Sequence, residues 1–130
     1  MTNERPPSKT VLWTGYVISA IPVIFMTVGG LVFLFFASDK VTEGMAKYGY
    51  PASAAKPILI AEILSGLIYA IPQTATLGAV LLTGYLGGAV ATHVHAGEPF
   101  FFPIIFGLLV WLGLWLRDTR FHPLLPLRKV

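Results

Sequence analysis

Glu62 is the residue in this sequence whose presence is hardest to explain by packing alone. It lies in the stretch ILIAEILSGLIYAIP (residues 58–72), in which every other residue is uncharged and most are apolar. An acid in such a segment is costly in a membrane and usually faces the protein interior or a polar cavity. Its carboxyl group could bind a small polar headgroup or accept and release a proton. Alternatively, it could be a structural group that hydrogen-bonds to a neighbouring helix.

Further polar side chains occur in a second apolar stretch, TGYLGGAVATHVHAGEP. Residues two apart on a helix point in nearly opposite directions, so His93 and His95 cannot both face the interior. We predict a polar cluster of Glu62, Tyr85, Thr92 and one histidine at one end of a helical bundle. The glycine pattern of this stretch favours His95 as the histidine that faces inward.

These residues do not form a recognisable metal or haem site. Haem ligation by two histidines needs them on facing helices at a similar depth. Here His93 and His95 are at one end of a single predicted span, and His122 is in the tail on the other side of the membrane. A zinc site built from one histidine and Glu98 would lack its third and fourth ligands. We therefore predict no metal site and no intrinsic cofactor. No catalytic motif is present, so the residues leave open whether the chain is an enzyme.

The composition indicates the environment in which these residues act. Of 130 residues, 55% are hydrophobic and 12% are charged, whereas soluble domains have about 25% charged residues. Long uncharged segments flanked by charges are typical of an integral membrane protein, whose first partner is the lipid bilayer. The basic residues lie mainly near the chain ends, as topology signals do, so we expect no nucleic-acid binding. The absence of cysteine excludes disulfides and thiolate chemistry within the chain.

We predict an all-α fold, a transmembrane four-helix bundle with a short amphipathic surface helix between the first and second spans. The predicted four-span membrane domain covers residues 11–117, and its spans are residues 11–37, 57–72, 75–95 and 99–116. Four spans place both termini on one side. Most Lys and Arg residues belong to that side, so the tails, residues 1–10 and 118–130, are predicted to be cytoplasmic.

Small and polar residues on the second span predict where the helices approach each other. Ser65, Gly66 and Tyr69 share a helical face with Glu62, so we expect this face to point into the bundle. The third span has a corresponding set of small residues that we expect to pack against it: Gly84, Gly87 and Gly88.

The connection between the second and third spans predicts which residues meet. Only a few uncharged residues around 72–74 separate the two spans, so they must form a tight antiparallel hairpin. In that hairpin, Glu62 lies level with about Leu86. Tyr85 and Thr83 are then its expected hydrogen-bond partners.

Several segments together resemble the DoxX-like family of small bacterial four-helix membrane proteins. These are KYGYP, ILIAEILSGLIYAIP, LGAVLLTGYLGGAVATHVHAGEP and the closing WLRDTR and LLPLR. The resemblance covers about residues 12–128 and is most specific over residues 77–99. It implies a four-helix bundle in the bacterial inner membrane with cytoplasmic termini. It also favours His93 over His95, because family members commonly have arginine at the position of His95.

The resemblance also suggests a function. Some family members are named as subunits of thiosulfate:quinone oxidoreductase, and others are linked to redox-stress complexes. It implies a redox-associated subunit, or a protein that binds a quinone or lipid-like ligand at the extracytoplasmic end, with a partner oxidoreductase or a second copy of the chain. The alternative is a non-catalytic membrane scaffold or assembly helper that acts through helix contacts. The expected ligand-binding residues are Glu62, Ser65, Tyr69, Tyr85, Thr92 and His93.

Overall fold

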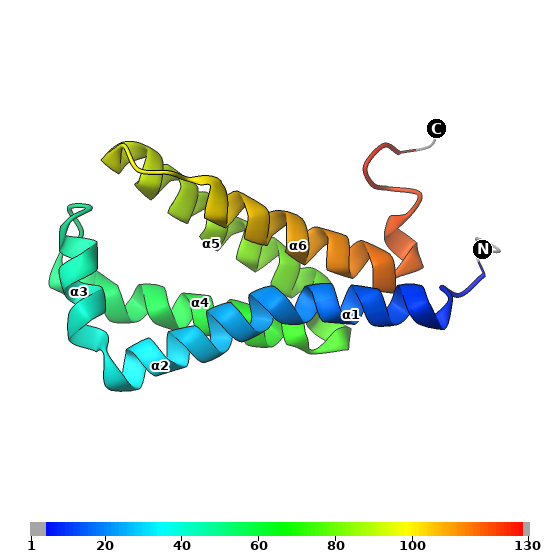
Figure 1. The fold of residues 1–130 in the computed structure, drawn as a ribbon, viewed down its shortest axis with the longest axis horizontal. Helices are drawn as coiled ribbons and strands as arrows, with labels where there is room; N and C mark the ends of the chain where they lie inside the picture. Colours follow the sequence, from blue (N-terminus) through cyan, green and yellow to red (C-terminus); the bar gives the residue numbers. More distant parts are fainter. Residues whose placement is uncertain (1–4, 129–130) are drawn as a thin grey trace.

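The computed structural model describes residues 5–128, which form helices joined by short turns (Figure 1). The first long helix consists of α1 (Lys9–Val23), a π-helical turn η1 (Ile24–Val28) and α2 (Gly29–Phe36). The other long helices are α4 (Ala55–Ala70), α5 (Ala75–Ala96) and α6 (Phe101–Arg117). The described residues contain no strand, which confirms the predicted all-α fold. Parts of the predicted tails, residues 1–4 and 129–130, lie outside the described residues.

The long helices have the dimensions of membrane spans. Three of them, Lys9–Phe36, Ala52–Ala70 and Pro72–Ala96, are long and apolar enough to cross a bilayer. The fourth, α6, is also apolar and has 17 residues, which corresponds to about 26 Å at the usual helical rise. The hydrocarbon core of a bilayer is about 30 Å thick, so this helix is close to spanning length. The chain is a multi-pass membrane protein.

A short helix, α3 (Ser38–Ala46), follows α2 and lies at the end of the bundle opposite the two termini (Figure 1). None of its residues is buried, as expected for a helix at the membrane surface. It ends before Gly49, whose φ of +82° is a left-handed conformation that glycine adopts without strain. This turn leads through η2 (Ala52–Ala54) into α4.

Helices α4 and α5 form the predicted hairpin, joined by the 3-10 turn η3 (Pro72–Thr74). The Thr74 hydroxyl closes the turn by donating a hydrogen bond of 2.7 Å to the carbonyl oxygen of Ile68. Gly78 lies directly on the backbone of Tyr69, where any added Cβ would collide. This contact brings the two helices together at the end nearest the termini.

Helices α1 and α6 also approach closely near the termini. A Cβ on Gly15 would lie 3.0 Å from the carbonyl oxygen of Gly113, and Gly113 in turn lies against Ser19. The Tyr69 hydroxyl extends from α4 into this contact, where it donates to the carbonyl oxygen of Val110 at 2.7 Å and lies 3.0 Å from the Ser19 hydroxyl. Small residues therefore allow three helices to meet around one buried tyrosine.

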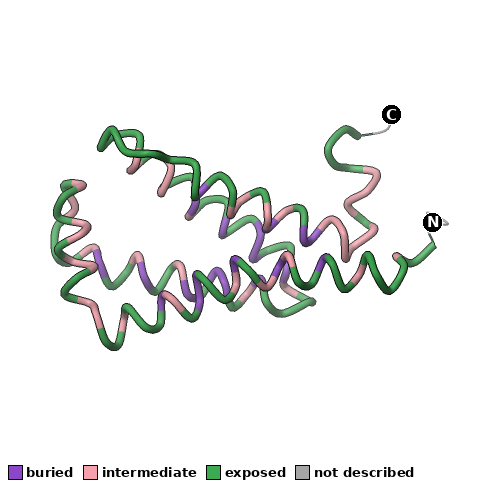
Figure 2. Tube along the Cα trace, in the orientation of Figure 1, coloured by how far each residue is buried: buried purple, intermediate pink, exposed green. Residues whose placement is uncertain are grey.

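The buried residues lie on the mutually facing sides of the helices (Figure 2). Most of the core comes from α4, α5 and α6, with one residue from η1: Met26, Tyr69, Ala75, Ala79, Leu82, Leu86, Val110 and Leu114. The outward sides carry large exposed apolar residues, as lipid-facing surfaces do.

Arg117 closes the core at the end nearest the termini. Its Cζ atom lies 5.4 Å from the ring centroid of Tyr16 and 5.0 Å from that of Tyr69, distances typical of cation–π contacts. Its Nε and Nη2 atoms are buried and find no hydrogen-bond acceptor among the described residues. The adjacent Asp118 instead binds Arg120, whose hydrogen bonds hold the pKa of the Asp118 carboxyl group below its usual value.

Candidate ligand-binding cleft

The helices separate at the end of the bundle opposite the termini (Figure 1). No Cα atom of α2 lies within 8 Å of α5 or α6, although α1 packs along α6. The aromatic rings of Phe25 and Phe106 stack with their centroids 4.8 Å apart and bridge the first helix and α6. The separation leaves a cleft of about 750 Å³ lined by residues from η1, α2, α3, the turn after α3, α4 and α5.

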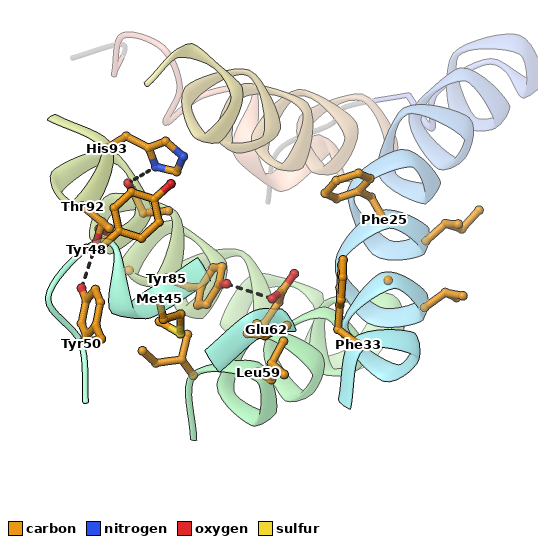
Figure 3. Close-up of a pocket in the computed structure, with 18 residues that line it drawn as sticks. Phe25, Phe33, Met45, Tyr48, Tyr50, Leu59, Glu62, Tyr85, Thr92 and His93 are labelled. Carbon is orange, nitrogen blue, oxygen red and sulfur yellow. Dashed lines mark hydrogen bonds between the residues drawn. The ribbon is translucent and has the colours of Figure 1, made fainter. Parts of the chain in front are cut away.

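The Glu62 carboxyl group lies inside this cleft, between Tyr85 and Phe33 (Figure 3). The Tyr85 hydroxyl donates a hydrogen bond to Oε2 of Glu62 over 2.9 Å. Tyr85 was one of the two partners expected from the hairpin register. The other, Thr83, instead donates to the carbonyl oxygen of Ala79 over 2.7 Å. Oε1 of Glu62 has no hydrogen-bond partner among the described residues, so it is available to a molecule in the cleft.

Two tyrosines that follow α3 connect this part of the chain to α5 across the outer end of the cleft (Figure 3). The Tyr50 and Thr92 hydroxyls form a hydrogen bond of 2.9 Å, and the Tyr48 hydroxyl donates to Oε2 of Glu98 over 2.7 Å. The Tyr48 ring also lies 5.8 Å from the His93 ring, centroid to centroid. The hydrogen bond to Glu98 raises the pKa of Tyr48, because it favours the protonated hydroxyl.

Only one of the two candidate histidines lies at the cleft. His93 lines it, with Nδ1 2.7 Å from the carbonyl oxygen of Ala89, whereas His95 is exposed and does not line it. The interpretation based on the glycine pattern, which favoured His95, is therefore wrong. The lining side of α5 extends round the helix from Gly84 and Gly88 through Tyr85 and Thr92 to His93, and it ends before His95 is reached along the chain.

Two other expected ligand-binding residues, Ser65 and Tyr69, do not line the cleft. The Ser65 hydroxyl donates to the carbonyl oxygen of Ala61 over 2.6 Å, and Tyr69 is fully buried in the core. Both share the helical face of Glu62, but they lie one and two turns closer to the termini. At that depth the helices are in contact, and the face forms core instead of cavity.

The glycines predicted to pack the hairpin divide into two groups. Gly66 is in tight contact with the Thr27 side chain, as expected of a packing residue. In contrast, a Cβ added to Gly84, Gly87 or Gly88 would meet no atom within 4 Å. The prediction that these three pack against α4 is therefore wrong, because α5 stays beside α6 and diverges from α4 toward this end (Figure 1). Gly84 and Gly88 line the cleft instead.

Sequence reasoning did not identify Tyr48, Tyr50, Phe25 and Phe33 as part of this site, although all four line it. The KYGYP segment contained information that could have identified its two tyrosines, because a glycine and a proline flanking an aromatic residue predict a turn of fixed conformation. The phenylalanines carried none, because they resemble the other apolar residues of the first span. Within residues 5–128, no three His, Asp or Glu side chains are grouped as a metal site requires.

The chain was compared with known protein families, curated proteins and solved structures. The model of the DoxX-like family matches residues 17–113. This range extends from α1 into α6 and includes Glu62, Tyr85, Thr92 and His93. No curated protein and no solved structure matches the chain.

Proposed function

The chain belongs to the DoxX-like family, and from this premise we propose that it binds a quinone or a lipid-like amphiphile in the cleft. In this proposal it is a membrane subunit that serves a partner oxidoreductase in the bacterial inner membrane, with both termini in the cytoplasm. The observation that carries the proposal is the Glu62 carboxyl group, which lies in an apolar cleft with one oxygen that has no hydrogen-bond partner within residues 5–128. A polar group left unpaired in a membrane costs several kcal/mol, roughly, which favours a ligand that satisfies it.

The size and chemistry of the cleft support this proposal. Its volume of about 750 Å³ falls within the range of small-molecule sites, which are mostly apolar and contain a few convergent polar groups. Here the polar groups are Glu62, Tyr85, Thr92 and His93. A neutral carboxyl group could donate a hydrogen bond to a quinone carbonyl, and a carboxylate could accept one from a hydroquinone hydroxyl.

The electrons for a quinone would come from the partner enzyme. The chain has no cysteine, so it offers no thiol pair for electron transfer. Its own contribution would be to hold the quinone headgroup at a fixed depth while the partner oxidoreductase reduces or oxidises it.

A pair of matched leucine variants tests whether the cleft binds the ligand. In lipid nanodiscs, Gly88→Leu fills the cleft, whereas Gly87→Leu adds the same side chain to α5 outside it. With decylubiquinone as the probe, we expect Gly88→Leu to weaken binding at least about tenfold, or about 1.4 kcal/mol, and Gly87→Leu to leave it nearly unchanged. Extraction and mass analysis of the purified protein should recover a bound amphiphile. Equal binding by both variants, with no amphiphile recovered, would exclude this function.

One observation favours the alternative function, a membrane scaffold or assembly helper. Gly87 is exposed, and a Cβ added there would meet no atom of residues 5–128 within 4 Å, so a helix from a partner or from a second copy could approach α5 closely there. If the chain works in this way, Gly87→Leu should abolish co-purification of the partner while Gly88→Leu preserves it. The opposite pattern would favour the ligand-binding function.

A further inference from the structure

The outer end of the cleft is closed by polar contacts. The Tyr48–Glu98 and Tyr50–Thr92 hydrogen bonds, of 2.7 and 2.9 Å, join the segment after α3 to the end of α5. This segment follows α3, which lies at the end of the bundle opposite the termini (Figure 1). The α4–α5 hairpin closes a second side. We expect these contacts to hinder the passage of water-soluble molecules to Glu62 from these two sides.

The side between α2 and the α5–α6 pair is open. No Cα atom of α2 lies within 8 Å of either helix, and no α6 residue lines the cleft. Cleft residues on the first helix therefore stay exposed, with Phe25 at 63%, Val28 at 52% and Phe33 at 47%. Neither α2 nor the part of α6 before Arg117 contains a charged residue. An apolar opening of this kind faces lipid in a membrane-embedded bundle.

The lining of the cleft also limits which headgroup can bind. Its polar residues are tyrosines, Thr92, His93 and Glu62, with no Lys or Arg to pair with a phosphate. Glu62 is seven residues beyond Ala55, the first residue of α4, so it lies about 10 Å below that end of the helix. A phosphate at that depth would lose its hydration and lie beside a carboxyl group.

From these observations we infer that the cleft admits its ligand sideways from the lipid, between α2 and the α5–α6 pair. The ligand is a chain-bearing amphiphile with a small uncharged headgroup. Its headgroup binds at Glu62 and Tyr85, and its hydrocarbon chain extends through the opening into the bilayer. The identity of the ligand rests on the proposed function, whereas the route of access rests on the helix arrangement alone.

The route can be tested by thiol labelling, because the chain has no cysteine of its own. Gly88→Cys places a thiol in the cleft without a clash. We expect a bilayer-dissolved alkyl maleimide to label it at least about tenfold faster than a charged thiosulfonate does. The exposed α3 variant Glu43→Cys should show the opposite preference. Equal access of the charged reagent to both thiols, or labelling of Gly88→Cys by neither reagent, overturns the inference.

A second substitution identifies the opening itself. Gly29 lies on α2 at the cleft, where a side chain would meet no atom within 4 Å. Gly29→Trp should slow alkyl maleimide labelling of Gly88→Cys severalfold, whereas the control Gly87→Trp should not. Unchanged labelling in Gly29→Trp would mean that the reagent enters elsewhere.

Protection experiments then separate the route from the ligand. Decylubiquinone should protect Gly88→Cys from the alkyl maleimide, whereas dodecyl phosphate, which has a charged headgroup, should not. Protection by the phosphate would overturn the uncharged-headgroup assignment. If the reagent preference is as expected but neither compound protects, the lateral route stands and the proposed quinone function fails.

Discussion

Alanine substitutions at Gly66 and Gly88 should change the stability of the bundle in opposite directions. A Cβ on Gly66 would overlap the side-chain oxygen of Thr27, which is itself only 6% exposed. Thr27 is β-branched and has few alternative rotamers, so α4 and η1 would have to move apart. Overpacking of this kind typically costs about 1–3 kcal/mol. A Cβ on Gly88 meets nothing within 4 Å, and Gly→Ala within a helix gains up to about 1 kcal/mol.

The free energy of unfolding of both variants can be measured by titrating the protein in mild detergent micelles with a denaturing detergent, with helicity as the readout. Both substitutions gain helix propensity, so the two variants should differ by the overpacking cost alone, about 1–3 kcal/mol, with the wild-type chain between them. Gly84→Ala is a matched control, because Gly84 is on the same helix, also lines the cleft and also has no neighbour within 4 Å. It should behave like Gly88→Ala.

One result would refute the reasoning. If Gly88→Ala destabilises the chain as much as Gly66→Ala does, then α5 packs against another helix at Gly88. The cleft would then be closed in the folded protein, and both the proposed ligand site and its lateral opening would be excluded.

Three further predictions concern individual polar contacts. Tyr85→Phe should destabilise the chain by about 0.5–2 kcal/mol, and a double-mutant cycle with Glu62→Gln should show non-additivity; strict additivity would disprove the contact. Arg120 lowers the folded-state pKa of Asp118, so the ion pair between them stabilises the folded chain at neutral pH. This contribution is lost as the pH falls through the folded-state pKa. Asp118→Asn should weaken the acid-side fall in melting temperature, and an unchanged pH profile would contradict the linkage. Arg117→Lys keeps the charge but loses the guanidinium contacts with two tyrosine rings, so we expect a loss of about 1 kcal/mol; wild-type stability would contradict this.

Much of the fold could be predicted because hydropathy and chain connectivity constrain it strongly. The short connection around residues 72–74 leaves α4 and α5 no arrangement other than a hairpin. The hairpin in turn fixes the register of α4 against α5, and this register predicts from the sequence alone that Tyr85 lies beside Glu62, as it does in the structure. Local spacing was enough for this contact, because both residues lie on adjacent, directly connected helices.

The cleft could not be predicted in the same way, because it depends on contacts between helices that are distant in sequence. The divergence of α2 from α5 and α6 is a tertiary property. The π-helical turn η1 follows Pro22, which lies within the first helix. A π-helical turn and a proline are both known causes of bends in helices. Hydropathy alone does not show in which direction the helix continues after such a bend.

The glycines show why one sequence pattern supported two different structures. Gly66 and Gly78 lie where the facing atoms are the Thr27 side chain and the Tyr69 backbone, so a missing side chain there becomes a close helix contact. Gly84 and Gly88 lie where the nearest helices have diverged, so the same missing side chain becomes empty volume. A small residue therefore specifies only that no side chain fills a space. Whether that space is filled by a neighbouring helix or remains a pocket depends on the position of the facing helix. Here the helices diverge beside Glu62, the only acidic residue of α4.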